Sequence, residues 1–123
     1  MTNGYEIVRA GYFDNRIIPI KNLDTRDGSE EHFALLASPI DSWEHERDFV
    51  NALKLFEYRE TVKNEVERFE EVLKNLNARL PNEITITPRP ESPKKLLDDE
   101  WNFQGVMWQE NDCFIAYFWL TTA

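Results

Sequence analysis

Few residues of this 123-residue chain have side chains that could assemble a metal site. His32, His45 and Asp48, which lies one helical turn after His45, could supply two imidazoles and a carboxylate. The spacing of metalloenzyme motifs such as H-E-x-x-H is not present. We therefore expect these residues to lie at a solvated helix start, and we predict no metal ligand and no cofactor.

Nucleophilic catalysis would have to use the single cysteine or a serine near a histidine. Cys113 stands beside Phe114 in an apolar segment, where a free thiol usually packs as a small hydrophobic group. A lone cysteine also excludes an internal disulfide and any multi-cysteine zinc site. We assign no catalytic residue, and enzyme activity is the less favoured interpretation.

Carboxylates are the chemical groups that the chain has in excess. Adjacent acids such as Glu30/Glu31 and Glu70/Glu71 are typical of solvated surface, but 98–100 is followed directly by Trp101. An acidic loop beside exposed rings could dock a basic partner, whereas the alternative is a polar connector into a buried strand. The candidate partner-binding residues are Asp98, Asp99, Glu100, Trp101, Trp108, Glu110 and Asp112.

The overall charge agrees with a basic partner. With 14 basic and 23 acidic residues the net charge is −9, which argues against direct binding to nucleic acid or to an anionic membrane. The same charge would attract a basic protein over a long range. No apolar run is long enough to span a bilayer, and the N-terminus lacks the features of a signal peptide. We expect one cytoplasmic domain comprising residues 1–123.

A stretch without Gly or Pro extends from residue 40 to residue 80 and predicts one long helix over about 41–80. Its first half has a broad apolar face that suits packing on a sheet. The apolar phase shifts between Phe56 and Val62, which allows a bend or break. Its second half has a heptad stripe, which could pack on the chain's own sheet or pair with a second copy. The candidate dimer or partner seam is Val62, Val66, Phe69, Leu73 and Leu76.

The remaining segments predict strands and hairpins. Residues 4–13 and 16–23 predict an N-terminal hairpin in which Pro19 marks an edge strand or a bulge. Residues 30–38 fit a strand or a short helix, and a strand is favoured, while 94–100 suggests one helical turn.

The last 23 residues give the clearest strand pattern. Residues 101–109 and 113–121 flank a polar turn and predict a C-terminal hairpin. The last strand is apolar on both faces, so it should be central. The fold class predicted is α+β, with an antiparallel sheet of five to six strands and the long helix across one face.

Three functional hypotheses follow. The first is a small acidic module of the immunity or anti-defence type, which binds and neutralises a basic protein such as a nuclease or toxin. The second is a small-molecule-binding domain or modest enzyme with a pocket between helix and sheet. The third is a structural homodimer that pairs through the seam.

Overall fold

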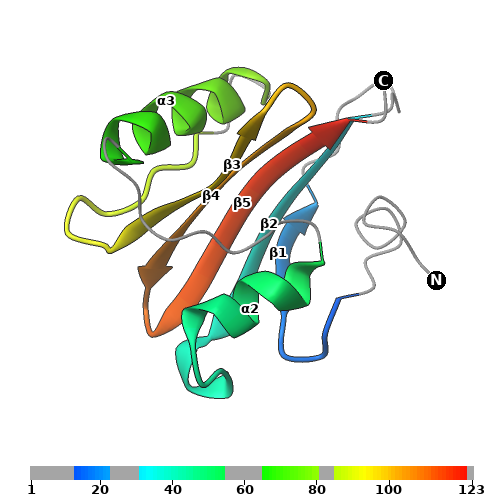
Figure 1. Ribbon diagram of the computed structural model, residues 1–123, viewed down its shortest axis with the longest axis vertical. Coiled ribbons are helices and arrows are strands. Elements are labelled where there is room, and N and C mark those ends of the chain that lie inside the picture. The colour runs from blue at the N-terminus through cyan, green and yellow to red at the C-terminus, as the bar shows by residue number, and fades with distance from the viewer. Residues whose placement is uncertain (1–12, 23–30, 55–64, 81–84, 122–123) are drawn as a thin grey trace.

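The computed structural model describes residues 13–22, 31–54, 65–80 and 85–121. In these residues it contains a five-stranded antiparallel sheet and two α-helices (Figure 1). The elements are β1 (Ile18–Asn22), β2 (Glu31–Pro39), the 3-10 turn η1 (Ile40–Ser42), α2 (Glu46–Leu53), α3 (Glu65–Ala78), β3 (Lys94–Glu100), β4 (Phe103–Glu110) and β5 (Cys113–Thr121). The order across the sheet is β1-β2-β5-β4-β3. The predicted α+β class with at least five antiparallel strands is confirmed.

Strand β5 is the centre of the sheet, as its two apolar faces predicted. It pairs with β2 on one side and with β4 on the other. Phe114 and Phe118 point to the face that carries α2, where Phe49 stacks on Phe114 with 5.2 Å between ring centroids. Tyr117 and Trp119 point to the opposite face and belong to a second core cluster with α3. The sheet therefore has a hydrophobic core on each side.

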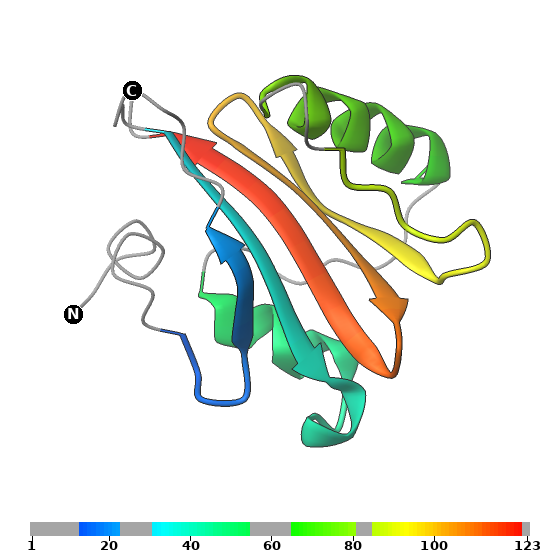
Figure 2. The ribbon, with the colours of Figure 1, turned by 180° about the vertical axis from the view of Figure 1, so that it is seen from behind.

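The prediction of one long helix across one face is wrong. Helix α2 begins at Glu46 rather than near Asp41, and it ends at Leu53, because Lys54 has a left-handed backbone with φ of 60°. Helices α2 and α3 belong to the two separate core clusters, so they cover opposite faces of the sheet. Helix α2 lies in front of the strands in Figure 1 and behind them in Figure 2. The apolar phase shift marks two helices with different partners, and the expected bend near residues 57–61 lies outside the described residues.

The N-terminal strand signals are confirmed where the structure describes them. Residues 31–39 form a strand, and β1 lies at the sheet edge with a register shift between Pro19 and Lys21. A proline and a bulge both discourage another strand from pairing at an edge. The first strand of the predicted N-terminal hairpin, residues 4–13, lies outside the described residues except for Phe13, which is in no strand.

Two β-hairpins make up the C-terminal part. Strands β4 and β5 pair around a turn in which Asn111 and Asp112 have φ of 52° and 61°, as a type I′ turn requires. The helical turn expected over 94–100 is wrong, because this segment is strand β3. Lys95 and Leu97 are both buried and the residues between and before them are less buried, so burial repeats every two residues, as in a strand, rather than every 3.6 residues, as in a helix.

Asn77 joins α3, the central strand and the segment after α3. Its side-chain Oδ1 accepts hydrogen bonds from Tyr117 Oη (3.1 Å) and from the Ile86 N–H (3.2 Å). Its Nδ2 donates to the Ile86 carbonyl (2.8 Å). We predict that Asn77→Ala lowers the free energy of unfolding by about 2 kcal/mol, since it removes three partly buried hydrogen bonds. Urea denaturation measures this, and Asn75→Ala on the exposed side of the same helix should change it by less than about 0.5 kcal/mol.

The same tyrosine predicts a loss of stability in alkali. Burial raises the pKa of the Tyr117 hydroxyl above its ordinary value near 10. The unfolded chain therefore releases this proton first, and the stabilisation present below pH 10 is lost as the pH rises beyond it. We expect the unfolding free energy of the wild type to fall more steeply above pH 10 than that of Tyr117→Phe, by up to about 1.4 kcal/mol per pH unit. Equal slopes in the two proteins would contradict this.

Candidate functional site

The turn between β3 and β4 presents the most exposed large aromatic side chain among the described residues. Trp101, with Asn102, forms this turn and is 75% exposed. Glu100 beside it is exposed, and Asp98 and Asp99 are partly exposed. Figures 1 and 2 both place the turn beside the C-terminal end of α3. We call residues 98–102 the acidic tip.

The acidic tip is braced by the elements around it. Asp99 accepts a hydrogen bond from Gln104 Nε2 (3.0 Å) and forms an ion pair with Arg68 of α3 (3.4 Å). The Asn102 carbonyl accepts a hydrogen bond from the N–H of Thr121 in the central strand (3.1 Å). The indole of Trp101 thus projects from a turn that is held on both sides. Binding of a partner would therefore cost little conformational entropy for ordering this turn.

Helix α3 continues the acidic surface next to the tip. Its exposed side carries Glu67, Glu70 and Glu71, against the bases Arg68 and Lys74. Because Arg68 already pairs with Asp99, Lys74 is the base that remains to offset these three carboxylates on the outer side of the helix. The outer side of α3 therefore carries more acids than bases, while Arg79, an exposed base, follows the helix at the end beside the tip.

The other predicted partner-binding residues lie elsewhere. Trp108 is only 4% exposed and packs in the α3-side core, so it offers almost no surface. Glu110 and Asp112 lie at or beside the β4–β5 turn, the opposite end of β4 from the tip. Eight strand residues span about 25 Å, so these acids do not join the tip. Glu110 lies 3.8 Å from Arg89.

Most side chains of the predicted seam are buried within the molecule. Phe69, Leu73 and Leu76 are buried in the core cluster between α3 and the sheet. Val66 is 69% exposed, and Val62 lies outside the described residues. These three residues of the stripe therefore cover the chain's own sheet, the first of the two alternatives that the sequence left open.

The histidine segment has a structural explanation. The His45 N–H donates to the carboxylate of Asp48 (3.1 Å), a capping arrangement that starts α2. Within the described ranges, no three His, Cys, Asp or Glu side chains are grouped closely enough to hold a metal ion.

A buried ion pair between α3 and β3 is a feature that sequence reasoning missed. The side chains of Glu65 and Lys95 are 7% and 8% exposed, and Glu65 Oε1 lies 3.9 Å from Lys95 Nζ. The same oxygen accepts a hydrogen bond from the Leu96 N–H (2.8 Å). This carboxylate covers a backbone donor of an edge strand and neutralises a buried ammonium. The sequence signal for this pair was the spacing of two between Lys95 and Leu97, which is typical of a strand. The helical interpretation of 94–100 overlooked it.

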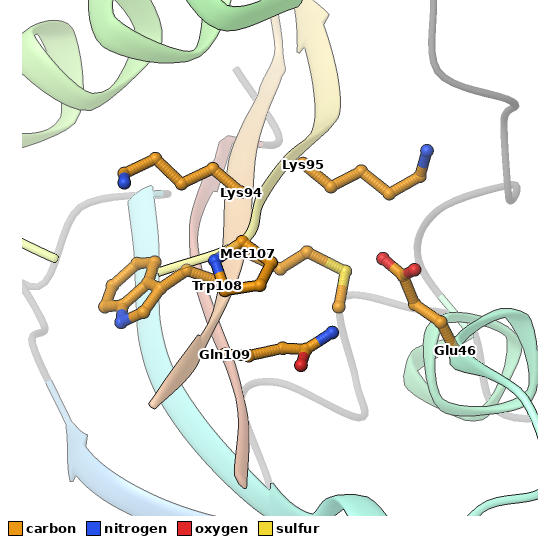
Figure 3. A pocket seen from close by; sticks show the side chains of 7 residues that line it. Glu46, Lys94, Lys95, Met107, Trp108 and Gln109 are labelled. Atoms are coloured by element: carbon orange, nitrogen blue, oxygen red, sulfur yellow. The ribbon is translucent and has the colours of Figure 1, made fainter. Parts of the chain in front are cut away.

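A small hollow of about 80 Å³ opens between the start of α2 and the strands β3 and β4 (Figure 3). We call it the Glu46 hollow, and its lining is Glu46, Pro93, Lys94, Lys95, Met107, Trp108 and Gln109. Burial raises the pKa of the Glu46 carboxyl; the charge of Lys95 acts against this rise and that of Glu65 adds to it. The hollow thus contains a partly desolvated acid whose burial the charge of Lys95 does not fully compensate.

A second, open groove lies beside α2 and is lined by Arg16, Ser42, Trp43, Glu44, Asp48, Asn51 and Ala52. The guanidinium of Arg16 lies 3.8 Å from the centre of the Trp43 ring and binds Asp14 through Nε and Nη2. The side-chain and backbone hydrogen bonds from Arg16 hold the pKa of the Asp14 carboxyl well below its ordinary value. The guanidinium of Arg16, the basic group of this lining, is therefore already paired.

Comparisons with protein-family models, with curated proteins and with solved structures find no match for this chain. Within the described residues, no helix has both the length and the apolar character needed to cross a membrane.

Proposed function

We propose that this protein is a small acidic binding module that docks on a basic protein in the cytoplasm and neutralises it, as immunity proteins and inhibitors of nucleases or toxins do. The observation that carries the proposal is Trp101, exposed on a braced turn next to three carboxylates. An aromatic anchor with a charged rim is the usual composition of a binding hot spot. Exposing the apolar surface of a large indole to water is unfavourable in free energy, and a partner that covers the indole would remove this cost.

The charge of the chain supports the nature of the partner. A net charge of −9, with the exposed acids of α3 beside the acidic tip, favours encounter with a positive surface. The homodimer alternative has less support, because Phe69, Leu73 and Leu76 are already buried against the sheet.

Affinity capture at low ionic strength tests this proposal. The baits are the wild type, Trp101→Ala and the matched control Val66→Ala, which truncates another exposed apolar side chain. We expect a basic protein to be retained by the wild type and by Val66→Ala, to be lost with Trp101→Ala, and to be released by high salt. If Trp101→Ala retains the same proteins as the wild type, the acidic tip is not the docking surface.

A further inference from the structure

The Glu46 hollow has an uneven charge balance. Three ionisable side chains influence one another there: Glu46 from α2, Glu65 from α3 and Lys95 from β3. Lys95 forms its ion pair with Glu65, whereas Glu46 makes no hydrogen bond or ion pair with the residues that the structure describes. Among the described residues, one negative charge therefore faces the hollow without a direct partner.

The Glu46 carboxylate is the group of the lining that a cationic ligand would bind. The Glu46 carboxylate points toward the thioether of Met107, with the side chains of Lys95 and Gln109 on either side (Figure 3). The ammonium of Lys94 is turned away and donates to the carbonyls of Arg89, Pro90 and Ser92. A cation entering the hollow would meet the Glu46 carboxylate and the apolar side chain of Met107, and would be repelled mainly by Lys95. The side-chain nitrogen of Gln109 lies on the side of the carboxylate, and its oxygen points away (Figure 3).

We propose that the Glu46 hollow is a binding site for a primary ammonium group. Such a group is compact, carries three N–H donors and can place its first methylene against Met107. A quaternary ammonium is bulkier and has no N–H, so it suits a hollow of about 80 Å³ poorly. A divalent metal would need more carboxylate or imidazole ligands than the described residues bring together. The site is separate from the acidic tip and does not depend on the proposed function.

The ammonium could belong to a free small amine or to a lysine side chain of another protein. Both present the same head group, but the lysine carries a peptide backbone that must fit outside the mouth of the hollow. The two sources are therefore distinguished by probes with and without a backbone.

The test is a titration followed by NMR of the Glu46 side-chain carboxyl. The probes are n-butylammonium chloride and acetyl-Gly-Lys-Gly-amide, and tetramethylammonium chloride and the trimethyl-lysine peptide are their controls at equal ionic strength. We expect saturable binding of a primary ammonium and a fall in the pKa of Glu46, because the cation binds only the ionised carboxyl.

Variants assign the effect to this carboxylate. Glu46→Gln, followed through the backbone signals of residues lining the hollow, should weaken binding about tenfold or more. Glu44→Gln, an exposed acid two residues earlier, should leave it unchanged. Binding of butylammonium alone assigns the site to a small amine, and binding of the lysine peptide shows that a protein side chain can enter. The proposal is overturned if neither primary ammonium binds, if the quaternary controls bind equally well, or if Glu46→Gln binds like the wild type.

Discussion

Replacing Glu65 by alanine should lower the free energy of unfolding by about 3–5 kcal/mol, the usual cost of breaking a buried ion pair on one side. The substitution leaves the ammonium of Lys95 in a site where its side chain is 8% exposed. It also removes the acceptor of the Leu96 N–H on edge strand β3. Both losses act on the contact between α3 and β3, so the edge of the sheet should open first. Urea denaturation followed by circular dichroism measures the change.

Two further variants separate charge from helix propensity. Glu70→Ala makes the same substitution at an exposed position of α3 and should cost less than about 0.5 kcal/mol. The double variant Glu65→Gln, Lys95→Met keeps an acceptor for Leu96 and removes the buried ammonium, so it should recover most of the stability. A cost for Glu65→Ala no larger than that for Glu70→Ala would show that the pair does not hold this edge.

Replacing Trp101 by alanine should leave the fold unchanged and weaken partner binding by at least about 2 kcal/mol, or roughly 30-fold in Kd. The indole is 75% exposed, so its removal creates no cavity in either core. The loss in binding follows because an aromatic anchor on a rigid turn contributes far more to a complex than to the free protein. Calorimetry with the captured partner measures the affinity, and thermal unfolding of the variant measures its stability.

A control variant distinguishes a specific role of Trp101 in docking from the loss of any exposed apolar side chain. Val66→Ala removes a side chain of similar exposure from α3 and should leave the affinity within about twofold. An equal loss from both variants would indicate a broad or non-specific surface rather than an anchor at Trp101.

Much of the sheet could be predicted from local pattern. The two apolar faces of 113–121 predicted a central strand, and Pro19 predicted an edge strand with irregular pairing. These signals are local because each depends on the alternation or the missing donor of a few residues. The C-terminal hairpin was predictable for the same reason.

The positions of helices α2 and α3 and the strand β3 could not be predicted from local sequence pattern. A Gly- and Pro-free stretch predicts helix, but it does not tell on which face of a sheet each part packs. The left-handed backbone at Lys54 ends α2 without any glycine to signal it. The spacing of two between Lys95 and Leu97 indicates a strand only if Lys95 is counted among the buried residues. Lysine is rarely buried, so the sequence did not reveal this pattern.

The candidate site was predicted in part. The sequence placed acids beside Trp101, and the structure gathers those residues at one turn. It could not show that Trp108 is buried or that Glu110 and Asp112 lie at the far end of β4, because these depend on strand pairing. The Glu46 hollow combines residues more than 60 positions apart along the chain, so no local motif reveals it.

The central claim is that an acidic surface around Trp101 docks on a basic protein, and its most direct test is the association rate constant measured at increasing ionic strength. With the captured partner, the rate constant of the wild type should fall steeply as salt is added. The variant Asp98→Asn, Glu100→Gln keeps the Arg68–Asp99 ion pair but removes two charges of the tip, so its rate should be lower and less dependent on salt. A wild-type rate constant that does not change with ionic strength would contradict the account.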